Sequence, residues 1–100
     1  MTFAIRRTLA ARDDLVDIWI AIAVHDVRAA DRHLDRIEDA ISKLGEFPRI
    51  GASRPELMPG ARALVRSPYL VVYTVDDLLR QVDIVRVVDA RRDLQVLFGS

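Results

Sequence analysis

Residues 45–60, with the sequence GEFPRIGASRPELMPG, divide this 100-residue chain into two parts of different periodicity. Three of the four prolines and three of the four glycines lie in this stretch. Proline stops a helix and stiffens a connection, so the parts on either side cannot form one continuous helical array. We interpret the stretch as a structural crossover that Ile50, Leu57 and Met58 attach to the core.

The part before the crossover has helical periodicity. The residues TFAIRR (2–7) predict a short opening strand, and Thr8 and Asp26 are suitable N-caps for two helices. Gly45 ends the second helix, and the short link between the helices requires them to run antiparallel. Apolar residues at helical spacing predict the faces that meet the sheet: Leu15, Ile18, Trp19, Ile22, Leu34, Ile37, Ile41 and Leu44.

The part after the crossover has the two-residue periodicity of strands. RALVR (62–66), YLVVYTV (69–75) and QVDIVRVV (81–88) are separated by short turns, which predicts an antiparallel meander. The second of these runs is apolar on both faces, so we expect it to be the central strand. ARRDLQVLF (90–98) predicts a short helix or tail. The sequence therefore predicts an α+β fold: an N-terminal strand, an antiparallel helical hairpin, an antiparallel β-meander and a short C-terminal helix or tail, in one domain spanning 1–100.

Composition excludes several functions. The chain has no cysteine, and its 15 basic residues balance 15 acidic ones, so no net basic field is available for nonspecific or sequence-specific nucleic-acid binding. Without a long apolar run or a signal-peptide core, we expect a cytoplasmic protein with no membrane association. No catalytic, cofactor-binding or metal-binding motif is present, and we expect His25 and His33 to be solvated.

Two arginine-containing features could nevertheless form a binding surface. Arg86 interrupts an apolar strand, so its guanidinium needs either an acidic partner or a solvent-facing surface. The segment DARRD (89–93) follows that strand directly and would lie near Tyr69 and Tyr73. A paired structural arginine and a charged terminus are the alternative interpretations.

Three segments in order along the chain resemble the RelE/ParE superfamily of toxin–antitoxin toxins, and its ParE branch in particular. They are ARDDLVDIWIAIAVHDVRAADRHLDRIEDAISKL, FPRIGASRPEL continuing to ARALVRSPYLVVYTV, and DIVRVVDARRDLQVLF. The resemblance implies a helical hairpin against a small curved antiparallel sheet. It also implies a toxin silenced by a cognate ParD-like antitoxin, in a module of the kind that stabilises plasmids. ParE-like toxins poison DNA gyrase, whereas RelE-like toxins cut messenger RNA on the ribosome.

The residues favour the gyrase alternative. The arginine that a RelE-like nuclease has in its central strand falls on Leu70, and the C-terminal tyrosine falls on Phe98; only one expected arginine is kept, as Arg92. Leucine cannot donate a hydrogen bond, and phenylalanine has no acid–base group. One departure from ParE-like sequences is Asp89, which stands where a histidine is common.

These observations predict a gyrase-binding inhibitor with no catalytic residue and no cofactor. A ribosome-dependent nuclease and a non-toxic module that still binds antitoxin remain the alternatives. We expect the gyrase surface to comprise Arg86, Arg91, Arg92, Asp93, Leu94 and Phe98. We expect the antitoxin surface to include Val16, Ile20, Tyr69 and Tyr73.

Overall fold

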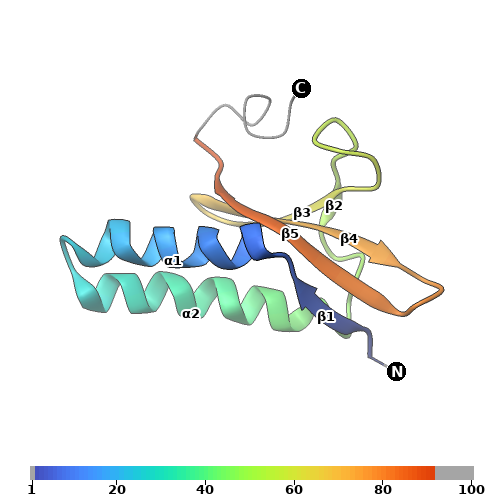
Figure 1. Cartoon of the computed structure of the whole chain (residues 1–100), viewed down its shortest axis with the longest axis horizontal. Coiled ribbons are helices and arrows are strands. Elements are labelled where there is room, and N and C mark those ends of the chain that lie inside the picture. Colours follow the sequence, from blue (N-terminus) through green and yellow to red (C-terminus); the bar gives the residue numbers. More distant parts are fainter. Residues whose placement is uncertain (1, 92–100) are drawn as a thin grey trace.

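The structure is a computed structural model that describes residues 2–91 of the chain, and it is an α+β fold of the predicted kind (Figure 1). A helical hairpin follows the first strand, and the remaining strands follow the hairpin. The elements are β1 (Ala4–Arg7), α1 (Leu9–Ala23), α2 (Val27–Lys43), β2 (Ala52–Ser53), β3 (Arg62–Arg66), β4 (Tyr69–Asp76) and β5 (Gln81–Asp89). The predicted terminal helix or tail at 90–98 lies almost wholly outside the described residues.

Both helices begin at the predicted capping residues. The hydroxyl of Thr8 accepts a hydrogen bond from the backbone N–H of Ala11, and the carboxylate of Asp26 accepts one from Ala29. Each side chain satisfies an N–H group that the first helical turn leaves without a partner. α2 ends at Lys43, two residues before the predicted stop at Gly45. The carbonyl of Gly45 then accepts a hydrogen bond from Phe3 at 2.7 Å, which ties the end of the hairpin to the start of the chain.

Within residues 2–91 the sheet has five strands in the order β1-β5-β4-β3-β2. The antiparallel β3–β4–β5 meander and the central position of β4 are confirmed. β1 pairs with β5 in parallel, with Ala4 opposite Gln81, so the first and last strands of the described chain lie side by side and β1 forms one edge of the sheet. β1 separates from β5 after Arg7, and the chain turns there into α1, which leaves the last residues of β5 without a neighbouring strand on that side.

The helices pack on one face of the sheet and form the main core with it. Val71 and Tyr73 of β4 meet Ile37 and Ile41 of α2 and its C-cap Leu44 here, and all of these side chains are almost completely buried. Seven of the eight predicted core positions are buried in this cluster or packed against it. Trp19 is the exception, because it is 36% exposed and its indole Nε1 donates a hydrogen bond to Asp31 on α2. Its position at the edge of the apolar face lets it bridge the two helices.

The crossover covers part of the opposite face of the sheet. Leu57 is 4% exposed and packs with Leu70, Val72 and Val88, and Met58 packs against the same group. These contacts confirm the predicted role of Leu57 and Met58. The prediction for Ile50 is wrong: its side chain is 52% exposed, because the chain around it turns toward solvent before reaching β2.

A buried hydrogen bond connects the crossover to the central strand. The hydroxyl of Tyr73 accepts a hydrogen bond from the backbone N–H of Gly51 at 2.9 Å, and the Tyr73 side chain is completely buried. Burial raises the pKa of this phenol. A Cβ at residue 51 would come within 2.7 Å of the Tyr73 oxygen and 2.8 Å of the Ala63 carbonyl, so only glycine fits this close approach.

Replacing Tyr73 with phenylalanine should lower the free energy of unfolding by about 1–2 kcal/mol, because the Gly51 N–H would remain buried without an acceptor. Urea denaturation monitored by circular dichroism measures the change. Tyr69→Phe is the matched control: no intramolecular hydrogen bond of its hydroxyl is seen among the described residues, so its loss should leave stability nearly unchanged. Equal effects of the two substitutions would contradict this role of Tyr73.

Candidate functional site

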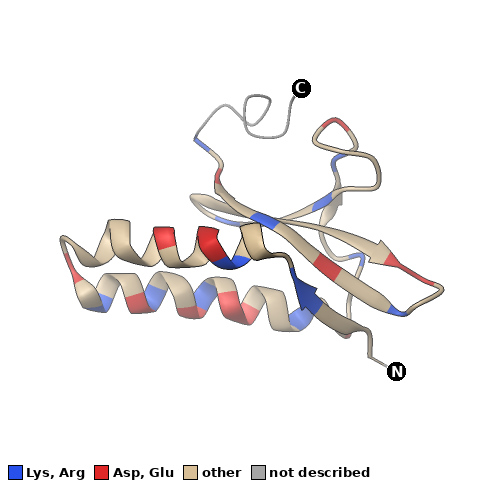
Figure 2. Ribbon diagram, viewed as in Figure 1, with Lys and Arg blue, Asp and Glu red and all other residues tan. Residues whose placement is uncertain are grey.

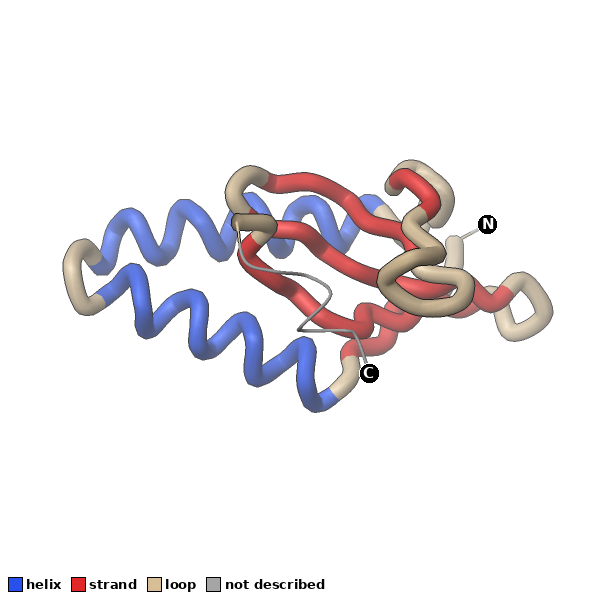
Figure 3. The backbone as a smooth tube through the Cα atoms, turned by 90° about the horizontal axis from the view of Figure 1, so that it is seen from above, coloured by secondary structure: helices blue, strands red, loops and turns tan. Residues whose placement is uncertain are grey.

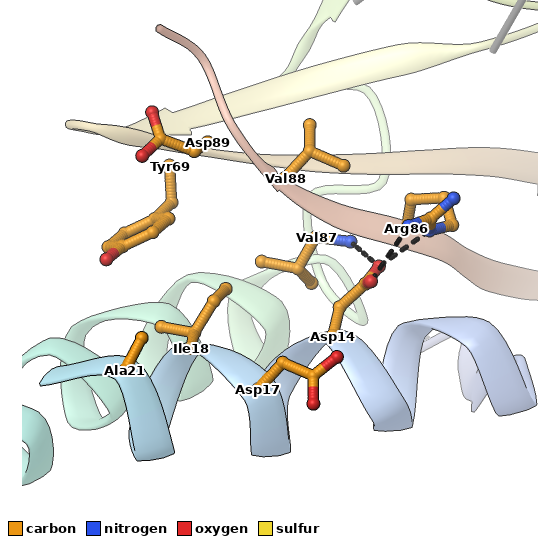
Figure 4. A pocket seen from close by; sticks show the side chains of 9 residues that line it. All are labelled: Asp14, Asp17, Ile18, Ala21, Tyr69, Arg86, Val87, Val88 and Asp89. Carbon is orange, nitrogen blue, oxygen red and sulfur yellow. Dashed lines mark hydrogen bonds and ion pairs between the residues drawn. The ribbon is translucent and has the colours of Figure 1, made fainter. Parts of the chain in front are cut away.

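A pocket of about 430 Å³ lies between α1 and the end of β5 (Figure 4). Ile18 and Ala21 of α1 and Tyr69 and Val87 of the sheet supply its apolar lining. Asp14 and Arg86 lie at one end of the pocket, whereas Asp89 lies toward the other (Figure 4). The last pair between β1 and β5 is Arg7 with Ile84. Beyond this pair α1 is the neighbour of β5, and the pocket lies between these two elements.

Asp14 connects α1 to this edge of the sheet. Its carboxylate accepts hydrogen bonds from Arg86 Nε at 2.7 Å and from an Arg86 terminal nitrogen at 2.9 Å. The same carboxylate accepts a hydrogen bond from the Val87 backbone N–H at 2.9 Å. One acidic side chain therefore neutralises Arg86 and also accepts the hydrogen bond of a β5 backbone N–H that β1 does not reach.

The residues of the predicted target surface differ in their surroundings. Arg86 is engaged in the bidentate ion pair with Asp14, which matches the structural interpretation of this arginine. Arg91 is 73% exposed in its side chain and pairs with Asp89 across two residues. The other predicted target residues, which are Arg92, Asp93, Leu94 and Phe98, lie outside the described part of the chain.

The outer face of α1, which we define as Leu9, Val16, Ile20 and Val24, is apolar and exposed. These residues are between 50% and 76% exposed, and they point away from the face that carries buried Ala11 and Leu15. Figure 2 shows that the end of α1 next to the turn, which is the part after Asp17, carries no charged residue, in contrast to α2, where both signs of charge interleave. A helix that is apolar all round is normally buried. The predicted surface residues Val16 and Ile20 therefore lie on an exposed apolar face, which is a surface that a binding partner would cover.

The two tyrosines predicted to contact an antitoxin are not on this face. Tyr73 is completely buried, so its prediction as a surface contact is wrong; its alternation in the strand points it into the core. Tyr69 is 8% exposed, lines the pocket, and packs edge-on against the ring of His33 with centroids 5.8 Å apart. His33 is thus half-buried against an aromatic ring, whereas the sequence predicted a solvated side chain.

A second ion pair connects β1 to α2. Arg7 donates hydrogen bonds to both carboxylate oxygens of Glu38, at 2.8 and 2.5 Å. These bonds hold the pKa of Glu38 below its ordinary value. The folded state therefore favours the ionised carboxylate, and the stability gained is present above the unfolded-state pKa and is lost as the pH falls through the folded-state pKa.

Glu38→Gln should therefore destabilise the protein at neutral pH and have a diminishing effect as the medium becomes acidic. The Glu38 side chain is 43% exposed, so the difference should not exceed about 1 kcal/mol at pH 7. Thermal melts of both proteins from neutral pH down to below the ordinary glutamate pKa measure this convergence. Asp35→Asn, a change on the exposed side of α2, is the control. A difference that stays constant across the range would show that charge is not its cause.

The face of the sheet opposite the helices offers no polar site at its centre. Leu70 and Val72 of β4, with Val88 of β5, are nearly fully buried beneath Leu57. Among the described residues, no group of three or more His, Cys, Asp or Glu side chains is arranged to hold a metal ion. None of the helices in the described part of the chain is long and apolar enough to cross a membrane.

Comparison with known families places this chain among the toxins of toxin–antitoxin systems. Residues 5–94 match the model of the ParE toxin of the type II toxin–antitoxin system parDE. The chain is 36% identical to Toxin ParE3 of Caulobacter vibrioides over 95 residues, which is 94% of this chain and 93% of that protein. The chain therefore belongs to the ParE family of the RelE/ParE superfamily, and it is a toxin of a type II toxin–antitoxin system.

Solved structures support the same fold. The chromosomal ParDE system from P. aeruginosa matches with a TM-score of 0.73 and 24% identity, covering 87% of this chain and 95% of that one. The RelBE2 toxin–antitoxin complex from Mycobacterium tuberculosis matches with a TM-score of 0.66 and 26% identity, covering 89% of this chain and 99% of that one. Both structures come from toxin–antitoxin systems.

Proposed function

We propose that this toxin acts in the cytoplasm by binding and inhibiting DNA gyrase, without catalysing a reaction. The observation that carries the proposal is the burial of Leu70, which is 4% exposed beneath the crossover. The RelE-like pattern has an arginine at this position, and that arginine would stabilise a transferring phosphate. An apolar side chain that is buried in one cluster with Leu57 and Val72 cannot donate a hydrogen bond to a phosphate.

The exposed end of β5 supports binding as the mode of action. Arg91 extends into solvent and pairs with Asp89, which lines the neighbouring pocket together with Tyr69 and other apolar and charged side chains. An exposed arginine near an aromatic side chain is a frequent composition of protein-binding hot spots. We assign the gyrase-binding surface to this end of the molecule, together with Arg92, Asp93, Leu94 and Phe98.

A ParD-like antitoxin is the partner proposed for the outer face of α1. Val16 and Ile20 lie four residues apart at its centre and are 57% and 50% exposed. An amphipathic helix laid along α1 would place its own apolar residues against them, and an extended segment beyond it could continue into the pocket at β5. Covering both regions would neutralise the toxin by occupying the proposed target surface.

Supercoiling assays with purified gyrase test the proposal. The purified chain should inhibit supercoiling, and expression without antitoxin should stop growth and relax plasmids. Arg91→Ala should weaken inhibition without changing the melting temperature, whereas Arg36→Ala, on the exposed side of α2, should have no effect. Ribosome-dependent cleavage of messenger RNA with supercoiling untouched would establish the nuclease alternative. Antitoxin binding with neither activity would indicate a non-toxic binding module.

A further inference from the structure

The pocket between α1 and the end of β5 has an excess of negative charge. The charged residues in its lining are three aspartates and one arginine: Asp14, Asp17, Asp89 and Arg86. Arg86 neutralises Asp14 through two hydrogen bonds, and Arg91 pairs with Asp89 from outside the lining. Asp17 has neither a hydrogen bond nor an ion pair with any other residue of the range 2–91. Its carboxylate is therefore available to a cation from outside this part of the chain.

The sequence of α1 does not neutralise Asp17 either. Residues three and four positions away are the neighbours of a side chain on a helix surface. For Asp17 these are Asp13 and Asp14 on one side and Ile20 and Ala21 on the other. Like charges four residues apart destabilise a helix, so the pair of Asp13 and Asp17 acts against folding. A local conflict of this kind is expected where a residue serves binding.

The walls of the pocket suit the stem of a long basic side chain. Ile18 and Ala21 project from α1 toward the pocket, and the ring of Tyr69 lies at its other end, near Asp89 (Figure 4). Lysine and arginine lay their methylene stems along apolar surface while the charged group reaches a carboxylate. Arginine also packs well against aromatic rings. The volume of about 430 Å³ is ample for one such side chain.

We propose that this pocket binds a lysine or arginine side chain of the antitoxin, which pairs with Asp17. The inference rests on the proposed antitoxin site on the outer face of α1, and it names the chemistry of the segment that continues from there. Each residue turns a helix by about 100°, so Asp17 lies between Ile20 of the outer face and Ala21 of the pocket. A segment that leaves the outer face for the pocket therefore passes this carboxylate.

The approach to the pocket along α1 is open on the hairpin side. Figures 1 and 3 agree that the turn between α1 and α2 lies well away from the strands. A partner laid along α1 from this end meets the apolar outer face first and the negative pocket next. Charge at the second place selects among antitoxins, because an acidic residue there would be repelled and a neutral one would leave the covered carboxylate unpaired.

The salt dependence of antitoxin binding to the purified full-length toxin tests the proposal. Asp17→Asn should weaken binding about fivefold at low salt, and raising the salt concentration should affect this variant less than the wild type. Asp35→Asn, on the exposed side of α2, is the matched control and should bind as the wild type does. Exchanging each lysine and arginine of the antitoxin for glutamine should identify one residue whose loss has no further effect on Asp17→Asn.

A small probe tests the pocket without the antitoxin. N-acetyl-arginine amide should shift the backbone amide signals of Ala21 and Val88 in NMR spectra of the isotope-labelled toxin, because both residues line the pocket. N-acetyl-citrulline amide has nearly the same shape without the charge and should shift them much less. The Asp17→Asn variant should respond equally weakly to both probes.

The outcomes separate this inference from the proposed function. An antitoxin that binds wild type and Asp17→Asn equally at every salt concentration would overturn the basic side chain and leave the antitoxin site intact. A toxin that binds the arginine probe but no antitoxin would support the preference of the pocket for a cation and overturn the antitoxin as its source. A probe that binds only after Arg92 is replaced with alanine would assign the pocket to the tail of the chain itself and overturn the proposal.

Discussion

Replacing Asp14 with alanine is expected to lower the free energy of unfolding by about 2–4 kcal/mol. The substitution removes both hydrogen bonds to Arg86 and leaves the Val87 N–H at the strand edge without its acceptor. Only 13% of the Asp14 side chain is exposed, so water replaces the carboxylate poorly. Arg86 is 29% exposed and can rotate partly into solvent, which keeps the loss below that of a fully buried pair.

Chemical denaturation of Asp14→Ala and Asp17→Ala measures this effect. Asp17 lies about one turn further along α1 and lines the same pocket, but its side chain is exposed. Its loss should change stability by less than about 0.5 kcal/mol. Arg86→Ala and the double variant complete a cycle that isolates the coupling between the two charges. The assigned role of Asp14 is wrong if both aspartate variants unfold at the same denaturant concentration.

Replacing Ile20 with glutamate is expected to weaken binding of a ParD-like antitoxin by at least about a hundredfold, or about 3 kcal/mol. The side chain lies at the centre of the outer face of α1 and is 50% exposed, so it can contribute to binding without being needed for folding. A carboxylate there would be desolvated beneath an apolar helix of the antitoxin, and the four residues of the outer face of α1 supply no counter-charge.

Isothermal titration calorimetry of the variant with the antitoxin provides the measurement. Leu79→Glu is the matched control, because this leucine is 68% exposed but lies at the opposite end of the molecule, in the β4–β5 turn. It should bind as the wild type does. An antitoxin that binds the Ile20 variant normally but loses affinity for the Leu79 variant would move the proposed interface to the strand turn.

Most of the fold could be predicted because its signals are local. The caps at Thr8 and Asp26 act within one helical turn, so the residues themselves identify the helix starts. The apolar run of β4 has no polar face to expose, which requires a central strand, and the order of the sheet agrees. Val16 and Ile20 were predicted as surface residues because they lie beside the core stripe of α1, and both are exposed.

The failures concern contacts between residues far apart in the chain. Periodicity identifies β1 as a strand but contains nothing about which strand it pairs with, so its parallel pairing with β5 could not be predicted. Arg86 signalled the need for an acidic partner, but the sequence offers many carboxylates, and only the path of α1 along β5 selects Asp14. Trp19 and Tyr73 were misplaced because helical and strand spacing assign a face without saying how deeply a neighbouring segment covers it.

The pairing of β1 with β5 determines when this toxin can exist as a folded molecule. The ribosome makes residues 4–7 long before it makes residues 81–84, which are their partners in the sheet. The hydroxyl of Thr8 and the carboxylate of Asp14 also bond to residues 85–87 of the same strand. A nascent chain that stops before β5 therefore has neither a closed sheet edge nor an anchored first helix. Translation must pass β5 before the cell contains a folded toxin, so we expect a product that stops earlier to be prone to proteolysis.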